Sequence, residues 1–249
     1  DGTINLTGSF NKHKNTTSEH RKSTVVINGS AQQNVHLSTG AGQTNGSCDF
    51  WNIVLNKTNE TTNATDNVVI TTGDTMIAGN RFSIIDGDVR GDNVGVCDTL
   101  EQIGQGNQGH SGDFFFIGTK TGDLILSGGN TLGTYTYNVN KATNTTAVQV
   151  WKGSSTDVLS QGNFNVVNGD LRFDDDVPAT VNGTVSIQNN GTLSMPAAEY
   201  FNLSNNFTAT ASSTLNHRMG TLNFIGNSAR DFDFGAPKRF YDIEFNRTA

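Results

Sequence analysis

Three carboxylates stand close together near the middle of the sequence, at Asp86, Asp88 and Asp92. Carboxylate oxygens at alternate positions of one loop are typical ligands of calcium. An EF-hand would need an oxygen ligand where Arg90 stands, and a glutamate further along the loop, and the sequence provides neither. We therefore predict only a loose calcium site at these three residues, and we expect no other cofactor.

A second acidic cluster, Asp174 to Asp176, has the residue type that polysaccharide hydrolysis needs, because paired carboxylates work there as acid and base. No accompanying motif of amide, histidine or basic side chains follows at a suitable spacing, and the five histidines lack metal-ligand spacing. We predict no catalytic residue and no enzymatic activity. The alternatives are a polysaccharide-degrading enzyme on a β-helix scaffold, or a carbohydrate-binding module that stacks sugars on Trp51 or Tyr241.

The two cysteines, Cys48 and Cys97, allow two interpretations, a pair of buried thiols or one disulfide. Both cysteines lie in stretches rich in Gly and Asn, which favours the disulfide. Closing this loop would contribute roughly 3 to 4 kcal/mol in the chain-entropy model.

Acceptor motifs for N-glycosylation, Asn-X-Ser/Thr, occur thirteen times, whereas chance predicts roughly six at this composition. Two explanations stay open. The excess is either a by-product of Asn-rich turns or the mark of a glycosylated, exported protein. The acceptors are Asn5, Asn15, Asn28, Asn45, Asn56, Asn59, Asn63, Asn144, Asn182, Asn190, Asn202, Asn206 and Asn246.

The charge of the chain excludes one class of partner. A formal net charge of -7 does not suit nucleic-acid binding, which requires a basic face that neutralises phosphates. No apolar run of about 18 residues is present, so we expect no membrane span. The first residues lack the basic and apolar regions of a signal peptide, so we expect that such a peptide has been removed or that the natural start lies elsewhere.

Short runs with alternating apolar residues recur throughout the chain, separated by steps such as Asn-Gly and Asp-Gly. In residues 180–195, for example, Val185 and Ile187 would point to one face while Thr184 and Ser186 point to the other. This pattern predicts an all-β protein. We expect a right-handed parallel β-helix, with an array of β-sandwich domains as the alternative.

Residues 5–58 are repeated by residues 202–248. The clearest match is that of the nine residues from Phe50 with the nine from Phe240. We divide the chain into a first solenoid part (1–84), an irregular insertion loop rich in Gly and Asp (85–113) and a second solenoid part (114–249). Internal repetition of β-rich sequence is typical of solenoids.

Several phrases resemble the repeats of secreted prokaryotic surface proteins, which are similar to the filamentous-haemagglutinin and autotransporter-passenger adhesins. The phrases are those at residues 181–187, 200–208, 220–229 and 240–248. This resemblance implies an extracellular β-helix at the cell surface, used for adhesion or as a scaffold.

The expected function is therefore that of a non-enzymatic structural subunit or stalk of a surface filament, sheath or adhesin. Neither end of the sequence looks capped, which predicts end-to-end assembly with identical units or with further repeats. Surface glycans are a further candidate partner.

Overall fold

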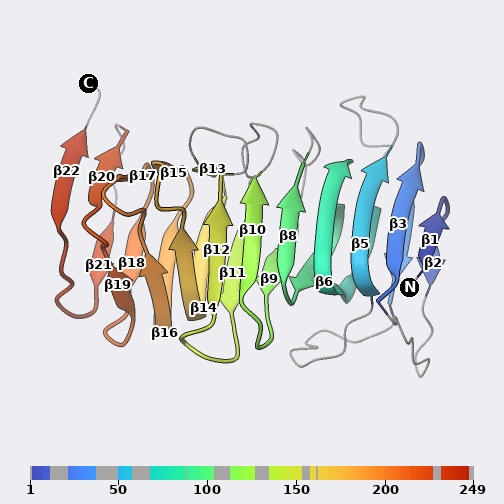
Figure 1. Cartoon of the computed structure of the whole chain (residues 1–249), viewed down its shortest axis with the longest axis horizontal. Helices are drawn as coiled ribbons and strands as arrows, with labels where there is room; N and C mark the ends of the chain where they lie inside the picture. The colour runs from blue at the N-terminus through green and yellow to red at the C-terminus, as the bar shows by residue number, and fades with distance from the viewer. Residues whose placement is uncertain are drawn as a thin grey trace.

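The computed structural model describes residues 2–11, 22–37, 50–57, 68–87, 89–103, 113–126, 135–152, 158–160, 162–226 and 231–246. Within these ranges there are strands and turns but no helix. The strands follow one another in coils that stack as a β-solenoid of about 8 turns. Figure 1 shows this stack from the side, with β1 and β2 at one end and β22 at the other.

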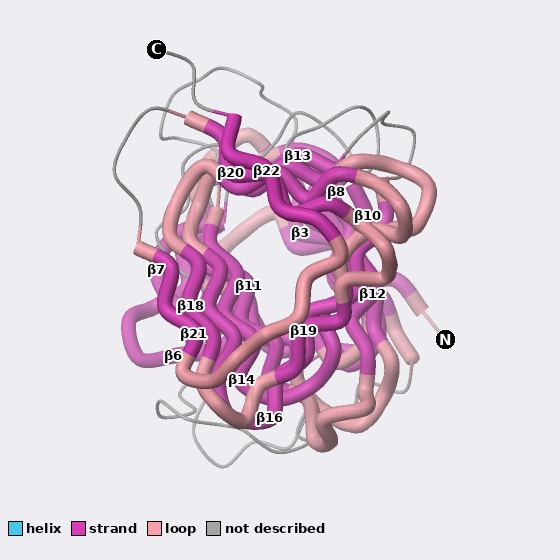
Figure 2. Tube along the Cα trace, turned by 90° about the vertical axis from the view of Figure 1, so that its left-hand side faces the viewer, coloured by secondary structure: helices cyan, strands magenta, loops and turns pink. Residues whose placement is uncertain are grey.

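Strands of successive coils stack in columns, and every strand pair among the described residues is parallel. This confirms the predicted all-β solenoid and excludes the alternative of β-sandwich domains, in which the strands would pair antiparallel. Figure 2, which looks along the stack, shows the coils superimposed around a common interior.

The first column consists of β1 (Thr3–Leu6), β3 (Thr24–Gly29), β5 (Phe50–Lys57), the second half of β6 (Val68–Asp86), β8 (Thr99–Gln102), β10 (Gly122–Leu126), β12 (Ala147–Trp151), the second halves of β14 (Asn163–Phe173) and β16 (Val185–Ser194), and β19 (Thr214–Asn216).

The second column consists of β2 (Phe10–Asn11), β4 (Gln33–His36), the first half of β6, β7 (Val89–Val96), β9 (Phe114–Phe116), β11 (Thr136–Asn140), the first halves of β14 and β16, β18 (Phe207–Ala209) and β21 (Phe232–Phe234). Both columns belong to one 17-stranded sheet. The third column is a separate sheet of β13 (Val158–Ser160), β15 (Ala179–Val181), β17 (Tyr200–Leu203), β20 (Thr221–Ile225) and β22 (Asp242–Asn246).

The core contains a continuous row of aromatic rings along the solenoid. Each ring contacts the next, with centroid distances between 5.1 and 6.4 Å. All of these side chains are fully buried. Such pairs contribute about 0.5–1.5 kcal/mol each beyond the apolar area that they bury. The row consists of Phe82, Phe114, Tyr137, Phe164, Phe173 and Phe201.

The predicted irregular loop over residues 85–113 is wrong for most of its length, because β7 and β8 lie within it and stack on their neighbours. Glycines occur in this segment because neighbouring coils pack closely against its backbone. A Cβ on Gly91, which has a φ of 94°, would lie 2.0 Å from the carbonyl oxygen of Ile70, so neither the backbone conformation nor the space admits a side chain. Residues 104–112 lie outside the described part of the chain.

The sequence repeat has a structural counterpart in the register of the strands. In the first column Thr3, Thr24 and Asn52 are level with one another. Tyr200, Thr221 and Asp242, their counterparts in the repeat, are level in the third column. The two copies therefore build the same stack of three strands, but in different columns.

Candidate assembly surface

The apolar row of the third column is exposed at β22, the last strand that the structure describes. Ile243 and Phe245 continue the inward row of Leu222 and Phe224, with which they are level. Leu222 and Phe224 are 0% and 8% exposed, whereas Ile243 and Phe245 are 40% and 67% exposed. Tyr241 beside them is 65% exposed. A cluster of exposed apolar side chains of this kind is typical of an interaction surface.

The described strand pairing also ends at β21 and β22. Among the described residues β22 pairs only with β20, and β21 only with β18. Each of these strands therefore presents one edge of N–H and C=O groups to which a further strand would add. At the opposite end of the solenoid β1 pairs with β3 and β2 with β4, and Ile4 is 52% exposed.

Amide side chains form hydrogen-bonded ladders on the outside of the coils. In the third column Asn202 Nδ2 donates to Thr180 Oγ1 (3.2 Å), and Asn223 Nδ2 donates to Asn202 Oδ1 (2.8 Å). Two other ladders have the same direction, because the amide of the later coil always donates to the oxygen of the earlier one. These ladders run from Asn80 through Asn52 to Thr24, and from Gln188 through Asn165 and Asn138 to Asp113.

Buried or partly buried cations satisfy backbone carbonyls of earlier coils. Lys141 Nζ donates to the carbonyls of Cys97 (3.0 Å) and Ile117 (2.8 Å). Lys57 donates to the carbonyl of Ala31, and Lys238 to that of Ser213. Burial lowers the pKa of Lys141 from 10.5 to about 8, even though the nearby negative charge of Asp98 opposes this shift.

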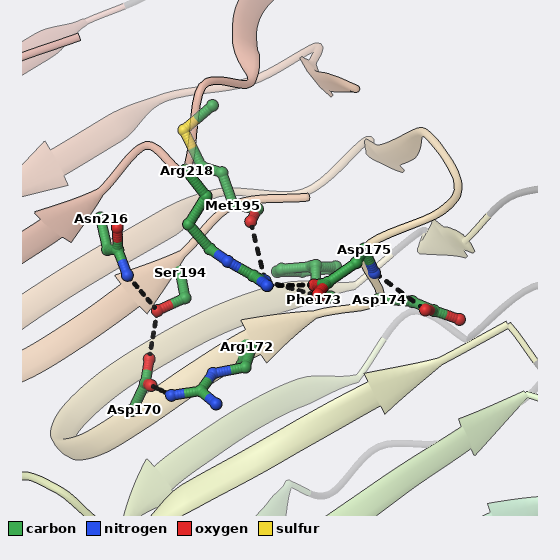
Figure 3. A network of polar contacts seen from close by, with 9 residues as sticks. All are labelled: Asp170, Arg172, Phe173, Asp174, Asp175, Ser194, Met195, Asn216 and Arg218. Atoms are coloured by element: carbon green, nitrogen blue, oxygen red, sulfur yellow. Dashed lines mark hydrogen bonds and ion pairs between the residues drawn. The ribbon is translucent and has the colours of Figure 1, made fainter. Parts of the chain in front are cut away.

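Two residues of the acidic cluster, Asp174 and Asp175, lie in a network of structural contacts (Figure 3). Asp175 forms an ion pair with Arg218, whose guanidinium also donates to the carbonyls of Phe173 and Met195. Asp174 Oδ1 accepts from the backbone N–H of Asp175 (2.8 Å). These contacts tie the turn after β14 to the coils that follow it.

A neighbouring carboxylate in Figure 3, Asp170, is also engaged. Asp170 is buried, and its two oxygens accept from Arg172 (2.7 Å) and Ser194 (2.8 Å). Asn216 donates in turn to Ser194 Oγ (3.4 Å). Sequence reasoning missed this network because the three outward residues that it joins belong to different coils.

Of the three residues proposed as a calcium site, the structure describes Asp86 and Asp92, so the site itself stays a prediction. Asp86 ends β6 in the first column, whereas Asp92 lies within β7 in the second. Asp88 lies outside the described residues. Within the described ranges, no three His, Cys, Asp or Glu side chains form a group that would hold a metal ion.

Of the two cysteines in the predicted disulfide, the structure describes only Cys97. Cys97 follows β7 and is half-buried, and its backbone N–H donates to the carbonyl of Ala78. Cys48 falls in residues 38–49, which are outside the described part of the chain. The pairing of the two cysteines therefore stays a prediction.

The acceptor asparagines occupy two kinds of position. Exposed ones are Asn5, Asn56, Asn144, Asn190 and Asn246, and half-buried ones are Asn28, Asn182, Asn202 and Asn206. Asn15, Asn45, Asn59 and Asn63 lie outside the described residues. If the protein is glycosylated, the exposed group is the one that an attached sugar would fit.

Glycopeptide mass spectrometry of protein from its natural source is expected to find sugar on Asn144 and Asn190 but not on Asn202. The Asn202 amide is half-buried and takes part in two ladder hydrogen bonds, which a sugar on Nδ2 would disrupt. The variants Asn144→Gln and Asn190→Gln are the controls, since each should remove one glycan mass. Sugar on Asn202 together with bare Asn144 and Asn190 would contradict the prediction.

No protein-family model, curated protein or solved structure matches this chain. In the described part of the chain, no helix has the length and apolar character needed to cross a bilayer.

Proposed function

We propose that the protein is a non-enzymatic structural β-solenoid, a subunit or stalk of an extracellular surface filament, sheath or adhesin that assembles end to end. The observation that carries the proposal is the open core at β22, where Ile243 and Phe245 continue a buried row but are themselves exposed. Burying this surface under a further coil would be favoured by roughly 25 cal/mol for each Å² of apolar area covered.

Two further features support an extracellular location. The excess of acceptor motifs suits a glycosylated surface protein, and five of the acceptors are exposed on the coils. The acidic surface and the many Thr, Ser and Asn side chains suit a solvated rod. Surface glycans remain a candidate partner on the same grounds.

The alternative functions receive less support from the contacts of the aromatic side chains. One face of Trp51 is covered by Lys120, whose Nζ lies 5.0 Å from the ring centroid. Tyr241 stacks on His217 with centroids 6.0 Å apart. Each of these rings therefore has one face occupied within the molecule, which leaves at most one face of each for stacking a sugar.

Assembly is tested by sedimentation and electron microscopy over a range of protein concentrations. The native chain is expected to associate as its concentration rises and to form rods, and Phe245→Asp is expected to stay monomeric, because a buried carboxylate in the interface would be unpaired. Trp151→Asp is the matched control. It changes an exposed aromatic residue on the side of the solenoid and should leave association unchanged. A native chain that stays monomeric at every concentration would refute assembly between copies.

A further inference from the structure

We propose that the outer face of the first column, at β10, β12 and β14, carries a binding site for a neutral sugar, with the indole of Trp151 as its stacking platform. The inference rests on the proposed function, in which surface glycans are a candidate partner, and it assigns a place and a ligand class to that partner. These three strands lie side by side on the flank of the stack in Figure 1. The site is therefore separate from the exposed row at β22.

The site is centred on an aromatic residue that faces away from the core. Trp151 is the last residue of β12, and its neighbour Val150 is 0% exposed, so the alternation along the strand places Trp151 on the outer face. It remains 43% exposed. Trp151 is level with Ile125 of β10, which is half-buried on the same face. Together they form a small apolar area between polar side chains.

A hydrogen bond holds the indole in one orientation. Trp151 Nε1 donates to Asp123 Oδ1 (2.8 Å), two residues before the level partner Ile125. The ring therefore extends diagonally across β10. Within the described part of the chain no aromatic ring or cation stacks on Trp151, in contrast to Trp51 and Tyr241. A side chain that is already ordered loses little conformational entropy when a ligand binds to it.

Polar side chains line up beside the ring. Asp123, Gln149 and Arg172 are level with one another in successive coils, so they form an outward row with a spacing of about 4.8 Å. The amide of Gln149 makes no hydrogen bond to any described residue, which leaves its donors and its acceptor for a ligand. The second carboxylate oxygen of Asp123 is a further acceptor. This row offers the donors and acceptors that sugar hydroxyls require.

The charges of the row favour a neutral ligand. Arg172 donates to the buried carboxylate of Asp170 (2.7 Å), so its positive charge is already paired. No cation of the described residues pairs with Asp123, so the row carries a net negative charge that disfavours anionic ligands. A purely apolar ligand would remove water from Asp123 and Gln149 without replacing its hydrogen bonds. A neutral hexose ring fits both requirements, because it has an apolar face of C–H groups and hydroxyls around its edge.

The site is tested by saturation-transfer NMR on the dilute full chain, with the methyl glycosides of glucose, galactose and mannose as separate probes. At least one of them is expected to bind with a Kd of about 1 mM, as a ligand of this size does on an open surface. Trp151→Ala is expected to weaken binding by at least about tenfold, because it removes the platform. Gln149→Leu keeps the shape of the side chain but removes its hydrogen bonds, and should weaken binding several-fold.

Trp51→Ala is the matched control, since it removes an indole that Lys120 already covers on one face, and it should leave the Kd unchanged. Circular dichroism checks that each variant is folded. A native chain that binds none of the three glycosides would overturn the inference, and so would binding that survives Trp151→Ala but is lost in Trp51→Ala. Tighter binding of glucuronate than of every neutral glycoside would overturn the choice of a neutral ligand.

Sedimentation of the same samples at high concentration separates this inference from the proposed function. The Trp151→Ala chain is expected to form rods like the native chain, because the site lies on the flank of the stack. Rods without sugar binding by the native chain would overturn the sugar site and leave assembly intact. Sugar binding by a native chain that stays monomeric would support the site and refute assembly between copies.

Discussion

Replacing Phe164 with alanine is expected to lower the free energy of unfolding by roughly 3 to 5 kcal/mol. The Phe164 ring is 1% exposed and lies between two other rings of the aromatic row, 5.2 Å from Tyr137 and 5.6 Å from Phe173. Its removal would leave a cavity that the parallel strands on both sides cannot close, because their spacing is set by backbone hydrogen bonds. Urea denaturation followed by circular dichroism measures the change.

The matched control for this experiment is Tyr200→Ala, which truncates an exposed aromatic residue on β17. Surface substitutions of this kind usually change stability by less than about 0.5 kcal/mol. If both variants lose the same stability, the aromatic row does not contribute in the way that its packing indicates.

The second large effect is a dependence of stability on pH that comes from Lys141. Its pKa is about 8 in the folded protein and 10.5 without the burial. Between these values the unfolded chain binds more protons than the folded chain, so stability rises with pH across this window. The full gain is about 3 kcal/mol, and it is absent below pH 8, where the lysine is charged in both states.

Lys141→Met is expected to remove this rise between pH 8 and 10.5. The slope of stability against pH is the quantity to compare, because the substitution also removes the donor to the carbonyls of Cys97 and Ile117 and so lowers stability at every pH. Lys152→Met, at a half-buried position after β12, is the control and should keep the slope of the native chain. A Lys141→Met variant with an unchanged slope would show that Lys141 is not the titrating group.

Much of the fold was predictable from period-two alternation of apolar residues. Val25 and Ile27, Leu171 and Phe173, and other such pairs are buried as the pattern predicts. Ile243 and Phe245 follow the same pattern but are exposed, because burial depends on the next coil as well as on the phase of the strand. The alternation alone therefore does not distinguish these two exposed residues from the buried ones.

Two features could not be read in this way. Lys57 and Lys141 stand at inward positions, two residues after Leu55 and Val139, where the alternation predicts an apolar side chain. A lysine at an inward position indicates that its ammonium group donates to backbone carbonyls inside the solenoid. The carbonyls that accept belong to earlier coils, so the sequence does not identify them. Strand β7 could not be predicted from the sequence for a related reason. The residue type at Gly91 is dictated by the backbone of a neighbouring coil and not by the alternation within the strand.

The direction of the backbone hydrogen bonds has a mechanical consequence. Because they join one coil to the next along the axis of the stack, a pull between the two ends in Figure 1 loads the coil contacts in series. The weakest contact would open first, and the rest would remain intact. Coils differ in length, as the pairing of Arg81 with Thr99 and of Gln33 with Val68 shows, so each opened coil would release roughly 60 to 120 Å of chain. Such a rod would be stiff under small loads and would lengthen in steps under large ones.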